Sequence, residues 1–195
     1  MKITRLECAD LGAGFPDKNL FSSVKFQLSP GDRIAVMGPS GCGKSTLLRR
    51  LVSISAPGQV DEGNVHREGT CCYLPQESRD CVLPWKSVRQ VLSSDLASAL
   101  GLGGVMDNFP SELSGGQLRR LALGQILSLQ RQILVLDEPL TGLDKDIREN
   151  AIRVILNSLS STSIVVFVTH YTEEADRLAT RILEWSTSNS TFELK

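Results

Sequence analysis

The chain has 195 residues, a formal net charge of −1 and a hydrophobic fraction of 41%. This length suits one well-filled core, and the near-neutral charge excludes a nucleic-acid partner held by bulk electrostatics. The longest apolar runs, residues 133–136 and 164–168, are too short to cross a bilayer, and Glu7 and Asp10 fall where a secretory signal needs apolar residues. We expect a cytoplasmic protein.

Strand-like and helix-like patterns alternate along the chain. Strand-forming sequences cover residues 2–8, 24–28, 33–37, 63–74, 132–137, 163–170, 181–186 and 191–195. Helical patterns cover residues 45–54, 86–100 and about 145–160. Continuous apolar strands that alternate with helices indicate a parallel sheet covered on both faces. Residues 76–127 contain no such strand, so we expect one α/β domain over 1–195, with a core of 1–75 and 128–195 and a helical subdomain over 76–127.

Five cysteines are present, and none of them has C-x-x-C spacing. The sequence therefore predicts neither a zinc site nor a disulfide framework. Cys71 and Cys72 are adjacent in an expected strand, and we interpret them as small core or edge residues.

A phosphate-binding loop follows the strand over 33–37. The sequence GPSGCGKST at 38–46 fits the pattern G-x-x-x-x-G-K-[ST] and opens a helix, where backbone N–H groups and the helix dipole attract an anion. Lys44 is expected at the β- and γ-phosphates of a nucleotide, Ser45 at Mg²⁺ and Thr46 at the α-phosphate. The candidate nucleotide-binding residues of the loop are Gly38, Pro39, Ser40, Gly41, Cys42, Gly43, Lys44, Ser45 and Thr46.

Two later strands end in polar residues. Asp137 and Glu138 close the run ILVLDEP, and His170 closes IVVFVTH. Since ligands bind at the carboxyl ends of the strands in such sheets, these residues should share an edge with the phosphate loop. We expect Asp137 to hold Mg²⁺, Glu138 to polarise the attacking water, and His170 to contact the γ-phosphate.

A second glycine-rich helix start lies at LSGGQ, residues 113–117. Ser114 and Gln117 have the spacing of a capping box, which predicts a helix that begins there with its positive dipole end exposed. Arg119 and Arg120 fall off the apolar stripe and are expected on a solvated face. That stripe comprises Leu118, Leu121, Ala122, Ile126 and Leu129.

The phosphate loop, LSGGQ, LVLDEP, LTGLD and the histidine, in this order, resemble the ATP-binding cassette (ABC) ATPases over essentially the whole chain. The resemblance implies a P-loop NTPase core with a mainly parallel sheet, antiparallel N-terminal strands and an inserted helical subdomain. It further implies that Gln76 touches Mg²⁺ and the attacking water, and that Asp144 crosses a dimer interface. Phe15 stands where the family places an aromatic ring on adenine, with a core position as the alternative.

In this family the LSGGQ segment closes on ATP held by a second cassette. By resemblance, Ser114, Gly115, Gly116 and Gln117 would bind the γ-phosphate of a partner, in an ATP-induced dimer that we expect to be a homodimer. The resemblance also implies integral membrane permease subunits, a solute-binding protein and a peripheral position on the inner face of the cell membrane.

The segment 81–91, CVLPWKSVRQV, resembles the ATPases of nitrate, sulfonate, taurine and thiamine-precursor importers, in the region that meets the membrane subunit. Import of a small solute is therefore expected, with a buried Trp85 at a helix start as the structural alternative for this segment. The rival function is a soluble ABC ATPase that acts on a non-transport macromolecular partner. That class carries long heptad insertions, paired cassettes or zinc modules, and the sequence contains none of these.

Overall fold

The computed structural model describes residues 4–195, so the first two residues of the expected strand 2–8 lie outside it. Contacts divide the chain into two compact units. We call the first the sheet unit; it comprises residues up to Tyr73, Arg131–Asp137 and Ser160–Lys195. The second, the helical unit, comprises Leu74–Gln130 and Glu138–Leu159.

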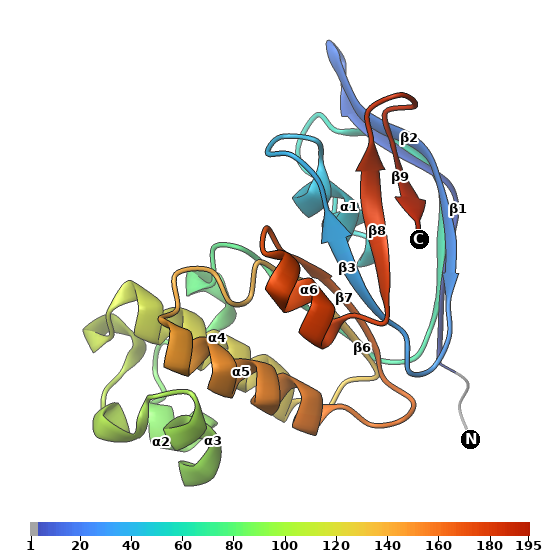
Figure 1. Ribbon diagram of the computed structural model, residues 1–195. Helices are drawn as coiled ribbons and strands as arrows, with labels where there is room; N and C mark the ends of the chain where they lie inside the picture. Colours follow the sequence, from blue (N-terminus) through green and yellow to red (C-terminus); the bar gives the residue numbers. More distant parts are fainter. Residues whose placement is uncertain (1–3) are drawn as a thin grey trace. The chain divides into compact units, whose positions relative to one another are not determined.

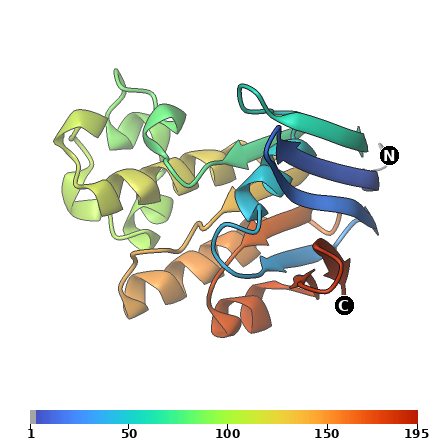
Figure 2. The ribbon, with the colours of Figure 1, turned by 90° about the horizontal axis from the view of Figure 1, so that it is seen from above.

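One layer of the sheet unit is a three-stranded antiparallel sheet in the order β2 (Lys18–Leu28), β1 (Arg5–Phe15), β4 (Val60–Glu68) (Figure 2). The first two strands are longer than the sequence indicated, because irregularities in the pairing of β1 break its alternation. At one of them Asp10 has a positive φ of 50°. An antiparallel N-terminal sheet was expected from the family resemblance, and it is present.

The other layer is a six-stranded sheet with β7 and β3 at its centre. Strands β6, β7, β3 and β8 run parallel, and β9 returns antiparallel to β8 (Figure 1). This confirms the expectation of a mainly parallel sheet built from continuous apolar runs. The full order is β5 (Cys71–Leu74), β6 (Ile133–Asp137), β7 (Ile164–Val168), β3 (Arg33–Met37), β8 (Arg181–Ser186) and β9 (Thr191–Leu194).

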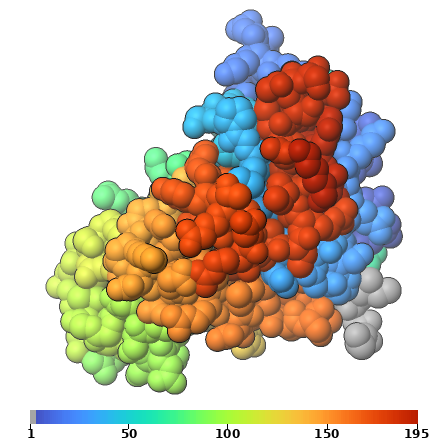
Figure 3. Space-filling model, in the orientation of Figure 1, coloured from blue at the N-terminus to red at the C-terminus, as the bar shows by residue number. Residues whose placement is uncertain are grey.

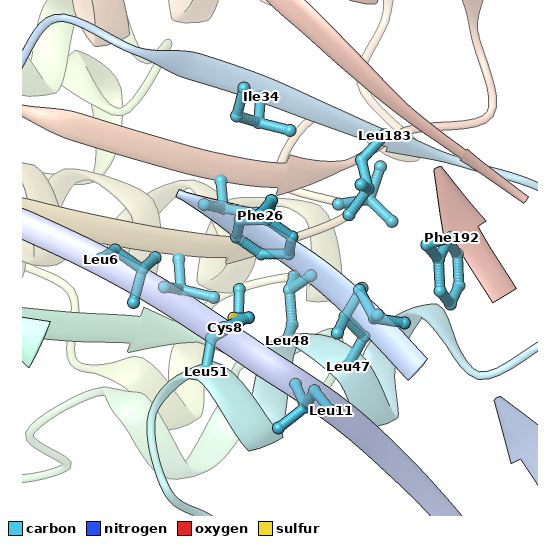
Figure 4. Close-up of a cluster of buried hydrophobic side chains, with 14 of the residues drawn as sticks. Leu6, Cys8, Leu11, Phe26, Ile34, Leu47, Leu48, Leu51, Leu183 and Phe192 are labelled. Carbon is cyan, nitrogen blue, oxygen red and sulfur yellow. The ribbon is translucent and has the colours of Figure 1, made fainter. Parts of the chain in front are cut away.

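The helix α1 (Lys44–Leu51) lies between these two sheets (Figure 2). Its residues Leu47, Leu48 and Leu51 are completely buried in a cluster that takes side chains from both sheets (Figure 4). Burial of a leucine side chain contributes about 2 kcal/mol, so this face fixes the helix and the loop that precedes it.

The C-terminal hairpin β8–β9 lies against the N-terminal strands, as the neighbouring red and blue surfaces of Figure 3 show. The amide of Ser22 donates a hydrogen bond to the carbonyl of Ser190 across 3.3 Å. Residues 187–190 form the turn that connects these two strands. The remaining helix of this unit is α6 (Thr172–Leu178), which follows β7.

The helical unit contains α2 (Val88–Val91), α3 (Ser94–Ala99), α4 (Gly115–Ser128) and α5 (Lys145–Ser158). A short 3-10 turn at Arg79–Cys81 precedes α2, and two more, at Gly103–Val105 and Pro110–Glu112, lie between α3 and α4. The expected helix over 86–100 is two helices, because Leu92 adopts an extended conformation and Ser93 caps a new start.

Contacts place α5 in the helical unit, whereas the sequence division put it in the core, because α5 packs on α3 and α4. Within residues 4–195, none of the helices has the length and apolar character needed to cross a membrane.

Candidate functional site

The phosphate loop connects β3 to α1 in a backbone conformation that needs glycine. Gly43, which precedes the first helical residue, has a φ of 101°. Residues other than glycine rarely adopt such a positive φ. Of the described residues, no side chain caps this helix and none of its first-turn residues is acidic. No acidic or capping side chain of residues 4–195 therefore occupies the backbone N–H groups at the start of α1, which are available to a bound anion.

Lys44 is the first residue of α1, and its side chain is buried, with 7% exposure. Its Nζ donates hydrogen bonds of 2.8 and 2.9 Å to the carbonyl oxygens of Gly38 and Pro39. The ammonium group is therefore held over the loop itself. Thr46 is equally buried, and its hydroxyl accepts a 3.3 Å hydrogen bond from Arg49.

Three strands of the sheet unit deliver polar residues to one edge. Asp137 ends β6 and pairs in register with Val168, the last residue of β7. Val168 pairs in turn with Val36, two residues before the phosphate loop starts. The loop, Asp137 and the Thr169–His170 segment therefore meet at the carboxyl ends of adjacent parallel strands (Figure 1).

Asp137 is 3% exposed, and its Oδ2 accepts a 3.4 Å hydrogen bond from the hydroxyl of Tyr73 on β5. His170 is exposed just beyond β7. The buried Thr169 fixes the backbone on either side of it: its hydroxyl accepts from the amide of Tyr171 at 3.0 Å and donates to the buried Glu174 at 2.5 Å. This arrangement orients His170 toward solvent at the edge that carries the phosphate loop.

Glu138 is the first residue of the helical unit's second segment, and it has a φ of 50°. Its Oε2 accepts a 3.1 Å hydrogen bond from the hydroxyl of Thr141. A non-glycine residue in the left-handed region stores about 1–3 kcal/mol of strain, and such residues concentrate at functional sites. No local sequence pattern predicts this conformation.

The helix α4 begins at the LSGGQ segment with the expected capping box. The Ser114 amide donates to Oε1 of Gln117 at 2.8 Å, and the Gln117 amide donates to Oγ of Ser114 at 3.3 Å. Ser114, Gly115 and Gly116 are exposed. The apolar stripe of α4 is buried as expected except at Leu129, which is 47% exposed because it lies at the end of the helix.

Arg119 is half-buried and not fully solvated, because it binds the backbone of two other segments. Its guanidinium donates a 2.9 Å hydrogen bond to the carbonyl of Thr141 and a 2.7 Å hydrogen bond to the carbonyl of Gln76. Arg120 is also partly buried. Arg119 thus joins α4 to the segments that carry Gln76 and Glu138, and these three segments line a hollow of about 530 Å³ in the helical unit.

The remaining expected residues are exposed. Gln76 follows β5 with a solvent-exposed side chain, and Asp144 caps α5 by accepting a 3.0 Å hydrogen bond from the Ile147 amide. Phe15 is 39% exposed at the end of β1, which rules out a core position, and it lines a hollow of about 330 Å³ with Val60. The predicted site residues therefore fall in two sets, one in each unit.

Burial disfavours the thiolate form of the cysteines. Burial raises the pKa of Cys8 and of Cys72 to about 12, and it raises the pKa of Cys42 against the opposing charge of Lys44. All five cysteines are free, in agreement with the sequence. Cys71 and Cys72 lie half-buried on the edge strand β5.

Trp85 is 69% exposed, so the alternative of a buried aromatic at a helix start is wrong. Phe109 is 43% exposed on a segment joined to the same region, because the amides of Val88 and Arg89 bond to the carbonyls of Asn108 and Met106. The helical unit therefore displays two aromatic side chains on neighbouring segments.

Comparisons with known proteins show the family of the chain. The family model described as "ABC transporter" matches residues 21–141. The aliphatic sulfonates import ATP-binding protein SsuB of Ralstonia nicotianae is 31% identical, over 92% of this chain and 69% of its own length. The Nod factor export ATP-binding protein I of Rhizobium etli is also 31% identical, over 93% of this chain and 65% of its own length.

Among solved structures, an inward-facing putative metal-chelate type ABC transporter matches the fold with a TM-score of 0.76. The match is 23% identical and covers 98% of this chain and 83% of the other.

Proposed function

This chain belongs to the ABC transporter family as an ATP-binding ATPase subunit, and on that premise we propose that it powers the import of a small solute through separate membrane subunits. One observation carries the proposal: the phosphate loop, Asp137 and His170 meet at the ends of adjacent parallel strands. That arrangement supports the proposal because hydrolysis of a γ-phosphate needs a phosphate cradle, a carboxylate and a hydrogen-bond donor in one region.

In this proposal the loop residues hold the phosphates of ATP. Lys44, which already donates to two carbonyls of the loop, is placed to transfer those bonds to the β- and γ-phosphates, and Thr46 serves the α-phosphate. Among residues 4–195, no group of three or more His, Cys, Asp or Glu residues could hold a metal alone. Mg²⁺ is usually held by one or two carboxylates together with waters and phosphates, so we assign Asp137 to it, with the oxygens of Ser45 and Gln76 as further ligands or partners of its waters. When bound, Mg²⁺ neutralises developing phosphate charge.

Hydrolysis in this scheme uses Glu138 to accept a proton from the attacking water. The Thr141 hydroxyl holds the carboxylate of Glu138 in place, and Gln76 contacts the same water. His170 donates a hydrogen bond to the γ-phosphate from its exposed position beyond β7. Phe15, exposed beside a hollow, stacks on the adenine ring.

The exposed start of α4 supports a dimer with a second copy of the chain. Ser114, Gly115 and Gly116 are exposed, a Cβ atom on either glycine would meet nothing within 4 Å, and Gln117 holds the turn by accepting from the Ser114 amide. In the closed dimer this start would bind the γ-phosphate held by the partner, and Asp144 would cross the interface.

The exposed pair Trp85 and Phe109 supports docking on a membrane subunit, since large exposed aromatics mark interaction surfaces. Docking there places the protein on the inner face of the membrane. Import, with a solute-binding protein as a further partner, is favoured because relatives such as that from Ralstonia nicotianae are named import proteins.

The test measures ATP hydrolysis by the purified protein, alone and with the membrane proteins that co-purify with it in mild detergent. Wild type should hydrolyse ATP in a Mg²⁺-dependent manner, and Lys44→Ala should reduce turnover by about a hundredfold or more, because it removes a phosphate contact of the transition state. Equal turnover by both proteins would refute the proposed site. Co-purification of only soluble macromolecules would refute the transport role.

A further inference from the structure

The two ends of the phosphate loop rest on side chains from distant parts of the sheet unit. A Cβ atom on Gly38 would lie 2.6 Å from Cβ of Trp185, so Trp185 occupies the space beside the first loop residue. A Cβ atom on Gly43 would lie 2.9 Å from Cδ1 of Phe21. Contacts below 3.0 Å force one side to move, so the loop backbone sits directly on both aromatic side chains.

A third ring joins these two. Phe192 lies edge-on to Trp185, with ring centroids 5.0 Å apart, and edge-on to Phe21, at 5.7 Å. The interplanar angles of 70° and 72° are those of favourable T-shaped pairs. Phe21 and Phe192 are buried, and Phe192 pairs with Trp185 across the β8–β9 hairpin. We call Trp185, Phe192 and Phe21 the aromatic row; Phe192 is among the labelled core side chains of Figure 4.

The row spans the loop from its first residue to the residue before α1. Gly38 and Gly43 have no side chains that could separate the backbone from the rings. The position of the rings therefore determines the position of the loop backbone between these two glycines. Phosphate binding by successive N–H groups depends on their alignment, and a displacement of about 1 Å can weaken such a site up to a hundredfold. The packing of the C-terminal hairpin therefore acts on the nucleotide site.

We propose that Trp185 and Phe192 are positioning residues for the phosphate loop, and that the C-terminal hairpin sets nucleotide affinity through the aromatic row. The proposal rests on the proposed function, since it assumes that the loop holds ATP. It adds to that function two residues that no sequence motif contains.

The first experiment replaces Phe192→Leu and compares it with Phe26→Leu. Phe26 lies on the same strand as Phe21, is also buried and belongs to the same core, but it is not part of the row. Both variants lose a ring from the core, so both should unfold at lower temperature than wild type. Phe192→Leu should also raise the KM for ATP about five- to tenfold, because it changes the alignment of the phosphate loop. Its kcat should stay within about twofold of wild type, because the residues that act in hydrolysis are unchanged. Phe26→Leu should leave KM within about twofold.

A second experiment uses Trp185 as a reporter. The chain contains only two tryptophans, so Trp85→Phe leaves Trp185 as the single fluorophore. In this background the addition of MgATP should change the fluorescence emission of Trp185, and the MgATP concentration at half of this change should equal that of half-saturation in equilibrium dialysis. When Phe192→Leu is added, both MgATP concentrations should rise. Phe192→Tyr, which keeps the ring, should restore the midpoint to within about twofold of the single-tryptophan protein.

Two results would overturn the proposal: equal KM values for the Phe192→Leu and Phe26→Leu variants, or nucleotide binding in dialysis without a response of Trp185. Absence of nucleotide binding to the wild type in dialysis would instead refute the proposed function. The two failures are therefore distinguishable.

Discussion

The chain has two glycine-rich helix starts, at α1 and at α4, and they are built in opposite ways. At α1 Gly38 is packed against Trp185 and Gly43 against Phe21, and no side chain caps the helix. At α4 the capping box of Ser114 and Gln117 holds the turn. A Cβ atom on Gly115 or Gly116 would meet nothing within 4 Å.

On the proposed function, we interpret this difference as one between a site that its own chain completes and one that a second copy completes. The α1 start depends on tertiary packing, so its geometry exists only in the folded sheet unit. The α4 start depends on a local hydrogen-bonded box, so its geometry survives exposure to solvent. An exposed, rigid anion binder suits a site shared between two copies of the chain.

The largest effect should come from Glu138→Gln. In the proposed dimer this variant keeps ATP bound between the α1 start of one copy and the α4 start of the other, without hydrolysis. We expect hydrolysis to fall about a thousandfold, because the base that accepts the water proton is lost, while binding is retained and the dimer accumulates. ATPase assays and gel filtration with and without ATP measure this. The exposed Glu193→Gln serves as a control with unchanged turnover. A monomer with wild-type turnover would exclude the role of Glu138.

The next effect tests the α4 start alone. Ser114→Arg places a bulky side chain where the partner's nucleotide would approach, so turnover should fall about a hundredfold. Affinity of the monomer for ATP should stay within about twofold, since the α1 start is untouched. Nucleotide titration of dilute protein measures this, with the exposed Ser94→Arg of α3 as a control. Loss of monomer binding would contradict a shared site.

A direct comparison of the two starts uses Gly43→Ala and Gly115→Ala. The first puts a methyl group against the Phe21 ring at a φ of 101°, and we expect a loss of about 2 kcal/mol in the free energy of unfolding. The second enters open space, so the change should stay within about 0.5 kcal/mol. Urea unfolding measures both. Similar losses would mean that the two starts depend equally on packing.

The smallest effect should come from Arg119→Ala, which releases the carbonyls of Gln76 and Thr141 from α4. Turnover should fall about tenfold as these segments loosen, and amide exchange near Gln76 should become faster. The exposed Arg153→Ala of α5 is the matched control. Unchanged exchange would show that Arg119 does not hold the Gln76 segment.

The sequence predicted the elements whose cause is local. The capping box at Ser114, the loop before α1 and the buried strand before Asp137 each have their determinants within a few residues. It did not predict the role of Arg119, because the carbonyls that Arg119 binds are 22 and 43 residues away, and any residue type supplies a carbonyl.

The aromatic row was missed for the same reason. Phe21, Trp185 and Phe192 have no common spacing, and only the sheet order brings them together. The exposure of Trp85 was also hidden, because a tryptophan beside proline fits a buried or an exposed helix start equally well. Long-range packing, and not local propensity, determines each of these features.

The position of β3 has a consequence for the timing of synthesis. Its two neighbours in the sheet, β7 and β8, follow it only after more than half of the chain has been made. At roughly 5–20 residues per second, a ribosome needs on the order of ten seconds to deliver them. The phosphate loop leaves the ribosome early, but the sheet around it forms only after β8 has emerged, so we expect ATP to stabilise only chains that already include β8.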